Sequence, residues 1–277
     1  MKKLTILTLL IIMLTQFDLL SQVGIYPQAV FLNQKNRASN LKVLNMTNET
    51  KEIILDLKFG YPDYDSLGNY SLVYGDTLPG AKWSAVPFVR MFPKRLLLKA
   101  NEEQVVKFML GNMGNVPDGT YFGRIHVLSK NPPEEIDTTY TESITAKIDI
   151  HFTLISALIV DKGKTYCDIS VKPMGTFSDS NMVNFLVNVN KDGNAPFLGT
   201  TEMKIYDSMG KLVAQSKDLT PFYFSGSRSF RFDKKLFSNG RYNVELTMSN
   251  EHKDVPDDFK VAIKPVKETF SVDLDGI

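Results

Sequence analysis

After residue 22 the chain consists mostly of short segments rich in Val, Ile, Phe and Tyr, separated by clusters of Asn, Gly, Pro and Asp. Segments of this kind are typical of β-strands, and helical periodicity is nearly absent. So many short strands with turn residues between them predict a Greek-key β-sandwich. The strands expected in the first half are Gly24–Leu32, Asn40–Met46, Glu52–Gly60, Phe88–Met91, Arg95–Leu98, Gln104–Leu110, Thr120–Leu128 and Ile144–Leu154.

The second half repeats this pattern, and the length of 277 residues suits two domains. The run Asp161-Lys162-Gly163-Lys164 interrupts the apolar sequence between the halves. We therefore predict an all-β fold with two immunoglobulin-like β-sandwich domains in tandem, over residues 22–160 and 161–277. The strands expected in the second domain are Tyr166–Val171, Val183–Val189, Glu202–Tyr206, Lys211–Gln215, Ser229–Phe232, Tyr242–Met248 and Thr269–Val272.

A short motif occurs once in each half, late in the predicted domain. Asp118-Gly119-Thr120-Tyr121 and Asn239-Gly240-Arg241-Tyr242 each place a Gly in a turn and a Tyr two residues later, at the start of a strand. This spacing is typical of the tyrosine corner of sandwich domains, in which the phenol hydroxyl bonds to backbone across the turn. The repetition supports two sandwiches rather than one.

The first 21 residues have the pattern of a cleavable signal peptide. Lys2 and Lys3 precede an apolar run over Leu4–Leu14, and Ser21 provides a small residue for cleavage. The alternative is a membrane anchor, which requires about 20 unbroken apolar residues. Asp18 and the polar residues before it interrupt the run. We therefore expect export, to the periplasm of a bacterium, without stable membrane insertion.

The composition argues against several classes of function. With 32 Lys and Arg against 31 Asp and Glu, the chain lacks the basic surplus of a nucleic-acid-binding protein. Cys167 is the only cysteine, so neither an intrachain disulfide nor a zinc-type cysteine cluster is expected. The three histidines, His126, His151 and His252, lack ligand spacing, and no serine lies in a nucleophile elbow. We expect no enzyme activity, no cofactor and no metal.

The segment Ile144–Leu154 shows strict alternation of apolar and polar residues. Two interpretations are open. It is either the last core strand of the first sandwich, or a strand whose N-terminal part provides an edge for β-strand addition to another chain. A polar loop, Ser129–Ser143, precedes it, and a second Gly- and Pro-containing stretch, Pro62–Val86, is expected to be an insertion or a long loop.

Several stretches together resemble the N-terminal domain of the PapD-like periplasmic pilus-assembly chaperones. The most specific is Pro93-Lys94-Arg95-Leu96-Leu97-Leu98-Lys99 followed by Glu102-Glu103-Gln104. The resemblance covers residues 23 to 160. Its other parts are Pro27–Phe31, Leu41–Thr50, the strand after Pro117-Asp118-Gly119, and Ile144–Leu154.

The resemblance implies a mechanism and a set of site residues. In the family, a cleft between two angled sandwiches holds a pilus subunit, the last strand of the first domain completes the subunit's fold, and a cleft Arg and Lys bind its terminal carboxylate. At the family's Arg position this chain has Gln28, and at its Lys position Asp149, with Lys147 on the same face. The donor positions are Tyr140, Glu142 and Ile144. The partner-binding residues expected are Gln28, Tyr140, Ile144, Ala146, Lys147, Ile148 and Ile150.

Two functions follow from these observations. The first is a chaperone that binds protein subunits of a surface appendage or secretion assembly by strand addition. The alternative is a structural adaptor of a cell-envelope complex, which uses the PapD-like domain as a rigid module and holds its partner through loops such as Pro62–Val86.

Overall fold

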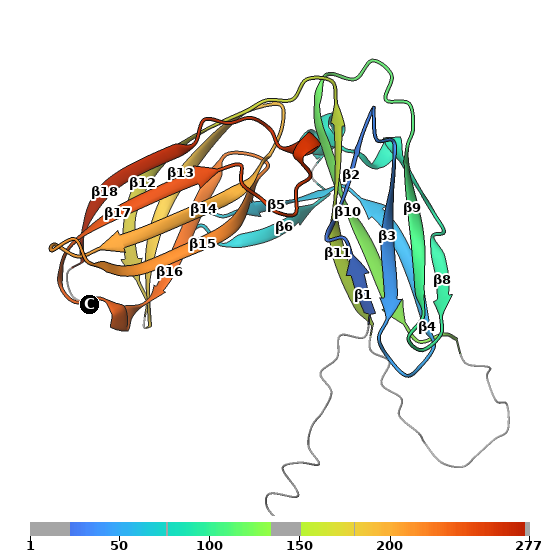
Figure 1. The fold of residues 1–277 in the computed structure, drawn as a ribbon, viewed down its shortest axis with the longest axis horizontal. Coiled ribbons are helices and arrows are strands. Elements are labelled where there is room, and N and C mark those ends of the chain that lie inside the picture. Colours follow the sequence, from blue (N-terminus) through green and yellow to red (C-terminus); the bar gives the residue numbers. More distant parts are fainter. Residues whose placement is uncertain (1–22, 76, 134–150, 180, 275–277) are drawn as a thin grey trace, which may run out of the picture.

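The computed structural model describes residues 23–75, 77–133, 151–179 and 181–274. They form two β-sandwiches that meet at an angle, and the polypeptide passes from the first to the second between β11 and β12 (Figure 1). Each sandwich has two sheets with a closed apolar core between them. The predicted all-β fold with two immunoglobulin-like domains is confirmed.

The first domain packs a four-stranded sheet, ordered β1-β3-β9-β7, against a five-stranded sheet, ordered β2-β11-β10-β4-β8. Alternate residues of each strand point inward, so the apolar positions meet in one core that includes Leu41, Phe108 and Ile125. The strands are β1 Val23–Tyr26, β2 Ala29–Asn33, β3 Ala38–Asn45, β4 Lys51–Lys58, β7 Val89–Phe92, β8 Arg95–Leu98, β9 Glu103–Leu110, β10 Gly119–Lys130 and β11 Phe152–Lys162.

The first predicted strand, Gly24–Leu32, is divided in the structure. Its first part, β1, pairs antiparallel with β3, and its second part, β2, pairs parallel with β11 in the other sheet. Pro27 lies between the two parts and has no backbone N–H to continue a ladder. The chain therefore changes sheets at this residue.

The second domain packs a three-stranded sheet, β12-β13-β16, against a four-stranded sheet, β15-β14-β17-β18. Cys167 is a free, buried cysteine at the start of β12. The elements are β12 Cys167–Ser178, β13 Met182–Gly193, β14 Phe197–Tyr206, β15 Leu212–Phe222, β16 Gly226–Asp233, the 3-10 turn η2 Lys234–Leu236, β17 Gly240–Ser249, the 3-10 turn η3 Asp257–Phe259, and β18 Val266–Leu274.

Both predicted tyrosine corners are present. The Tyr121 hydroxyl donates to the carbonyl oxygen of Pro117 at 2.8 Å, and the Tyr242 hydroxyl donates to that of Ser238 at 3.0 Å. Each ring is buried in the core of its own sandwich. The hydroxyl thus satisfies a turn carbonyl while the ring adds to the core.

Of the two alternatives for Pro62–Val86, an insertion or a long loop, the long loop is wrong, because most of the stretch is regular secondary structure. The strands β5, Gly60–Tyr64, and β6, Tyr70–Tyr74, form an antiparallel hairpin, which is followed by the helix α2, Thr77–Trp83, and the 3-10 turn η1, Val86–Phe88. The hairpin leaves the first domain and lies along the second, next to β15 and β16 (Figure 1).

Tyr64 shows how closely the hairpin joins the second domain. Its ring belongs to the core of the second sandwich, with its centroid 5.0 Å from that of Phe222. The Arg228 guanidinium lies 5.5 Å from the ring centroid. Burial raises the pKa of Tyr64 to about 12. A residue of the first half of the chain therefore completes the core of the second domain.

We expect Tyr64→Ala to destabilise the protein by about 3 kcal/mol, since it removes a buried ring from the second core. Chemical denaturation followed by circular dichroism measures this loss. Leu67→Ala is the matched control, because Leu67 is 52% exposed at the tip of the same hairpin and should change stability little. Equal effects of the two substitutions would contradict the assignment of Tyr64 to the core.

Candidate functional site

The site lies where the outer face of the five-stranded sheet meets the second domain. Three aromatic residues, Tyr61, Phe122 and Tyr223, form a buried cluster with Ile159 at this junction. The centroids of the Phe122 and Tyr223 rings are 4.6 Å apart. These contacts fix one domain on the other and form one wall of a cleft.

A cavity of about 340 Å³ opens between the domains beside this cluster. Most of its walls are apolar or aromatic and come from both domains. Cavities of this size with few polar groups are typical of binding sites. The polar residues that line it are Gln28, Arg124, His252 and Asp254, together with the hydroxyl-bearing rings of Tyr70 and Tyr223.

Arg124 is the most unusual of these residues. It lies on β10 opposite Ala157 of β11, and it is only 6% exposed. Its guanidinium carbon is 5.4 Å from the centroid of the Tyr223 ring, and its Nε has no hydrogen-bond partner. No described carboxylate forms an ion pair with it. A buried cation without an anionic partner is costly, and an anion in the cavity would reduce that cost.

Gln28, predicted as a partner-binding residue, lies in this cleft. Its carbonyl oxygen accepts hydrogen bonds from the Ser156 hydroxyl at 2.8 Å and from the Ala157 N–H at 3.4 Å. The neighbours of Gln28 on β11 are thus Ser156 and Ala157, and neither is basic. The other predicted partner-binding residues lie outside the described residues: Tyr140, Ile144, Ala146, Lys147, Ile148 and Ile150.

The predicted strand Ile144–Leu154 is described only from His151 onward. There β11 begins at Phe152 and continues to Lys162, so the predicted end at Leu154 is wrong. The strand continues because Leu158 and Val160 keep the apolar alternation on the core side. The predicted end of the first domain, residue 160, therefore falls within β11.

The edge of β11 has two different parts. Residues Ala157–Asp161 pair with β2, whereas within the described chain residues 152–156 pair only with β10. The Ala157 N–H points to the β2 side, so the backbone N–H groups of Ile155 and Thr153 point to the same side by alternation. This short stretch is an open strand edge that leads directly to Gln28.

His126 lies two residues beyond Arg124 on the same face of β10, next to Ile155. Its ring is 5.2 Å from that of Tyr74 on the hairpin, and its Nε2 is buried without a hydrogen-bond partner. Burial, and secondarily the nearby Lys58, lowers the pKa of His126. This shift favours the uncharged form of His126, and Arg124 is the one Lys or Arg among the described residues that line the cleft.

Sequence reasoning did not identify Arg124. A signal for it exists in the alternation of β10, which places Arg124 on the same face as Phe122, whereas Tyr121 and Ile125 face the core. A charged residue next to an aromatic one on an outer face is also typical of an ordinary solvated sheet. Arg124 is buried because the second domain covers this face of the sheet, and the sequence does not reveal the position of that domain.

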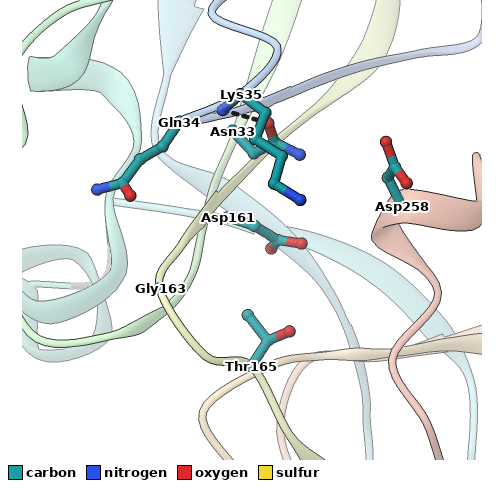
Figure 2. A pocket seen from close by; sticks show the side chains of 7 residues that line it. All are labelled: Asn33, Gln34, Lys35, Asp161, Gly163, Thr165 and Asp258. Atoms are coloured by element: carbon teal, nitrogen blue, oxygen red, sulfur yellow. Dashed lines mark hydrogen bonds between the residues drawn. The ribbon is translucent and has the colours of Figure 1, made fainter.

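A second hollow, of about 230 Å³, lies at the linker between the domains (Figure 2). Figure 2 shows Asp161 next to the turn at Asn33 and Lys35 of the first domain, with Asp258 of the second domain across the hollow. The Thr120 hydroxyl donates to Asp161 at 2.6 Å, so this carboxylate already has a partner. Burial nevertheless raises the pKa of Asp161 to about 6.

This raised pKa predicts a pH dependence of stability. The folded state holds the Asp161 proton more tightly than the unfolded state, so its favourable contribution is full below pH 4 and is lost as the pH rises through about 6. Asp161→Asn should therefore raise stability by about 1–3 kcal/mol at pH 8 and change it little at pH 4. Thermal unfolding at the two pH values measures this effect. Asp258→Asn, an exposed change in the same hollow, should leave stability unchanged at both pH values. If the two variants changed stability equally, the raised pKa could not be assigned to Asp161.

The described residues contain no group of three or more His, Cys, Asp or Glu side chains placed to hold a metal ion. Within the same part of the chain, none of the helices has the length and apolar character that crossing a membrane requires.

Comparison with known proteins gives matches only among solved structures. No family model matches the sequence. No curated protein matches it significantly. The YadV chaperone is 13% identical with a TM-score of 0.48, and the match covers 92% of this chain and 100% of that one. The complex of the SafA pilin with the SafB chaperone from Salmonella enterica is 12% identical with a TM-score of 0.44, covering 91% and 97%.

The E. coli chaperone DraB also matches, with 11% identity, a TM-score of 0.43 and coverage of 89% of this chain and 95% of that chain. The solved structures to which this chain is similar thus include several that are described as chaperones.

Proposed function

We propose that this protein is a periplasmic, chaperone-like protein that binds subunits of a surface appendage or secretion assembly by β-strand addition. In this proposal residues 1–21 direct export, residues 22–160 form the subunit-binding domain, and residues 161–277 form the second wall of the cleft. The observation that carries the proposal is the edge of β11 over residues 152–156, which no described strand covers and which ends at a cavity lined by Arg124, a buried arginine that forms no ion pair with a described carboxylate.

The open edge determines where a subunit strand would bind. An added strand can pair with residues 152–156 but cannot continue past Gln28, because β2 occupies the edge from Ala157 onward. Toward the N-terminus the edge would continue into the predicted donor residues, Tyr140, Ile144, Ala146, Lys147, Ile148 and Ile150. Main-chain hydrogen bonds would supply affinity, and these side chains would supply specificity.

Arg124 is our candidate for the residue that fixes the register. The end of an added strand at Gln28 would lie beside Ala157, whose cross-strand neighbour is Arg124. The added strand would lie beyond β11, two strand spacings or about 10 Å from β10, so the arginine side chain must extend across β11 to reach it. A guanidinium can bind a terminal carboxylate by two parallel hydrogen bonds. In this proposal Arg124 replaces the cationic anchor that Gln28 and Asp149 do not provide.

Strand addition is tested by Ile155→Pro, which removes one outward N–H without removing a bond to β10. We expect at least about fivefold less captured subunit, since one backbone bond is lost and the proline ring blocks the edge. The chain is co-expressed with the secreted β-rich subunits encoded beside its gene, and the subunit that co-purifies is quantified. Ile155→Val is the matched control. If Ile155→Pro captures as much subunit as Ile155→Val, the β11 edge is not the binding strand.

The anchor is tested by Arg124→Gln, with binding of a peptide from the subunit's carboxyl terminus measured as free acid and as amide. We expect wild-type protein to prefer the acid by about 10-fold or more, and the variant to bind both equally. Arg90→Gln, on the exposed face of the other sheet, should leave the preference unchanged. An equal preference in wild type and Arg124→Gln would exclude Arg124 as the anchor.

The alternative function, a structural adaptor of a cell-envelope complex, relied on Pro62–Val86 as an exposed binding loop. Much of this stretch instead forms the hairpin and packs against the chain's own second domain. No described feature favours the adaptor over the chaperone.

A further inference from the structure

A third interdomain cavity, separate from the strand-binding edge, has the properties of a small-molecule site. Its volume is about 450 Å³, which is within the range of pockets that bind ligands. Tyr223 lines both this cavity and the cleft, while β11 contributes none of its described lining. It therefore requires a separate functional explanation.

The cavity is positively charged. Lys82 at the end of α2 and Lys191 on β13 both line it, and none of its lining residues in the described part of the chain is acidic. The Lys191 Nζ donates one hydrogen bond, to the Gly193 carbonyl oxygen at 2.9 Å. Neither lysine forms an ion pair with a described carboxylate. Burial lowers the pKa of Lys191, the nearby Cys167 and Asp192 oppose this shift, and Lys82, the smallest of these influences, lowers the pKa further. An anion placed between the two ammonium groups would relieve their repulsion.

The walls of the cavity suit a flat apolar group. Trp83, Phe122 and Phe224 contribute aromatic rings, and the Lys82 Nζ lies 4.8 Å from the Trp83 ring centroid. Aromatic rings stack favourably on such walls in offset or edge-to-face geometry. The cavity thus combines two cations with an aromatic surface.

The floor of the cavity is rigid. The Asn194 side chain donates to the Asp118 carbonyl oxygen at 3.0 Å, and the Thr120 N–H donates to the Asn194 carbonyl oxygen at 2.9 Å. Gly119 allows this close approach, since a Cβ there would lie 2.7 Å from the Trp83 ring. A preorganised site loses less free energy on ordering when it binds a ligand.

We propose that this cavity binds a small anion that carries an aromatic ring, with its carboxylate or phosphate between Lys82 and Lys191 and its ring against Trp83. The inference goes beyond the proposed chaperone function and does not depend on it. Because the cavity is lined by both domains, such a ligand would also stabilise the interdomain contact.

The test uses the fluorescence of Trp83, the only tryptophan in the chain. The full-length mature protein is titrated with benzoate and with phenyl phosphate, which distinguish the two anionic groups. We expect a saturable change for at least one of them, and at least tenfold weaker binding of neutral benzyl alcohol and of inorganic phosphate. Calorimetric titration repeats each measurement without relying on the fluorophore. Absence of saturable binding of both aromatic anions by both methods would overturn the proposal.

The double variant Lys82→Gln/Lys191→Gln should weaken binding of the preferred anion at least tenfold and leave the unfolding temperature of the unliganded protein within a few degrees. Lys211→Gln, an exposed change in a turn of the second domain, is the matched control and should bind as wild type. The ligand should raise the unfolding temperature of wild type and of Lys211→Gln but not of the double variant. Unchanged affinity in the double variant would show that the anion binds elsewhere and would overturn the assignment.

Discussion

The packing of aromatic rings at the domain junction is the interaction on which the other features depend. Phe122 comes from the first sandwich, Tyr223 from the second and Tyr61 from the hairpin, and all three are almost completely buried. Without these contacts neither the cleft nor the cavity beside Trp83 would have two walls. Arg124 would then lie on an ordinary solvated sheet face, where its charge would carry no cost. The contacts at the junction therefore bury residues that would otherwise lie on the surface, and these residues line the candidate site.

Under the proposed function, the cleft would tolerate the movement of a charged group. Strand addition needs a free backbone edge and a fixed end point, and neither requires a particular side chain on β11. The end point would be the start of β2 at Ala29, and the cation would be Arg124, one strand further away on β10. The sheet would then keep edge and charge together although Gln28 is neutral.

The sequence predicts much of the fold because its local signals agree with the tertiary structure. The Gly-x-Tyr turns at Tyr121 and Tyr242 are confirmed in atomic detail, and the alternating segments form the sandwich strands. The hairpin was missed because β5 and β6 are stabilised by the second domain, far along the chain. Stabilisation of this kind comes from tertiary contacts, which the pattern of a short sequence segment does not reveal.

The site was less predictable than the fold. Gln28 does lie in the cleft, but Arg124 was missed because its burial depends on the orientation of the two domains. The remaining predicted residues, from Tyr140 to Ile150, are outside the described part of the chain, so their role stays a prediction. The Pro27 division of the first strand does leave a local signal, because the inward positions change from Val23 and Ile25 before Pro27 to Val30 and Leu32 after it.

The insertion of Tyr64 into the second core has a consequence for the order of folding. Tyr64 is synthesised long before Phe222, whose ring it contacts in the folded protein. The Tyr64 side chain therefore has no core to enter until the second sandwich assembles. Closing a contact over so many residues carries a large entropic cost. The coupling between the sandwiches runs in one direction, because removal of the hairpin with the first domain would open the core of the second, whereas the first core contains no described residue of the second domain.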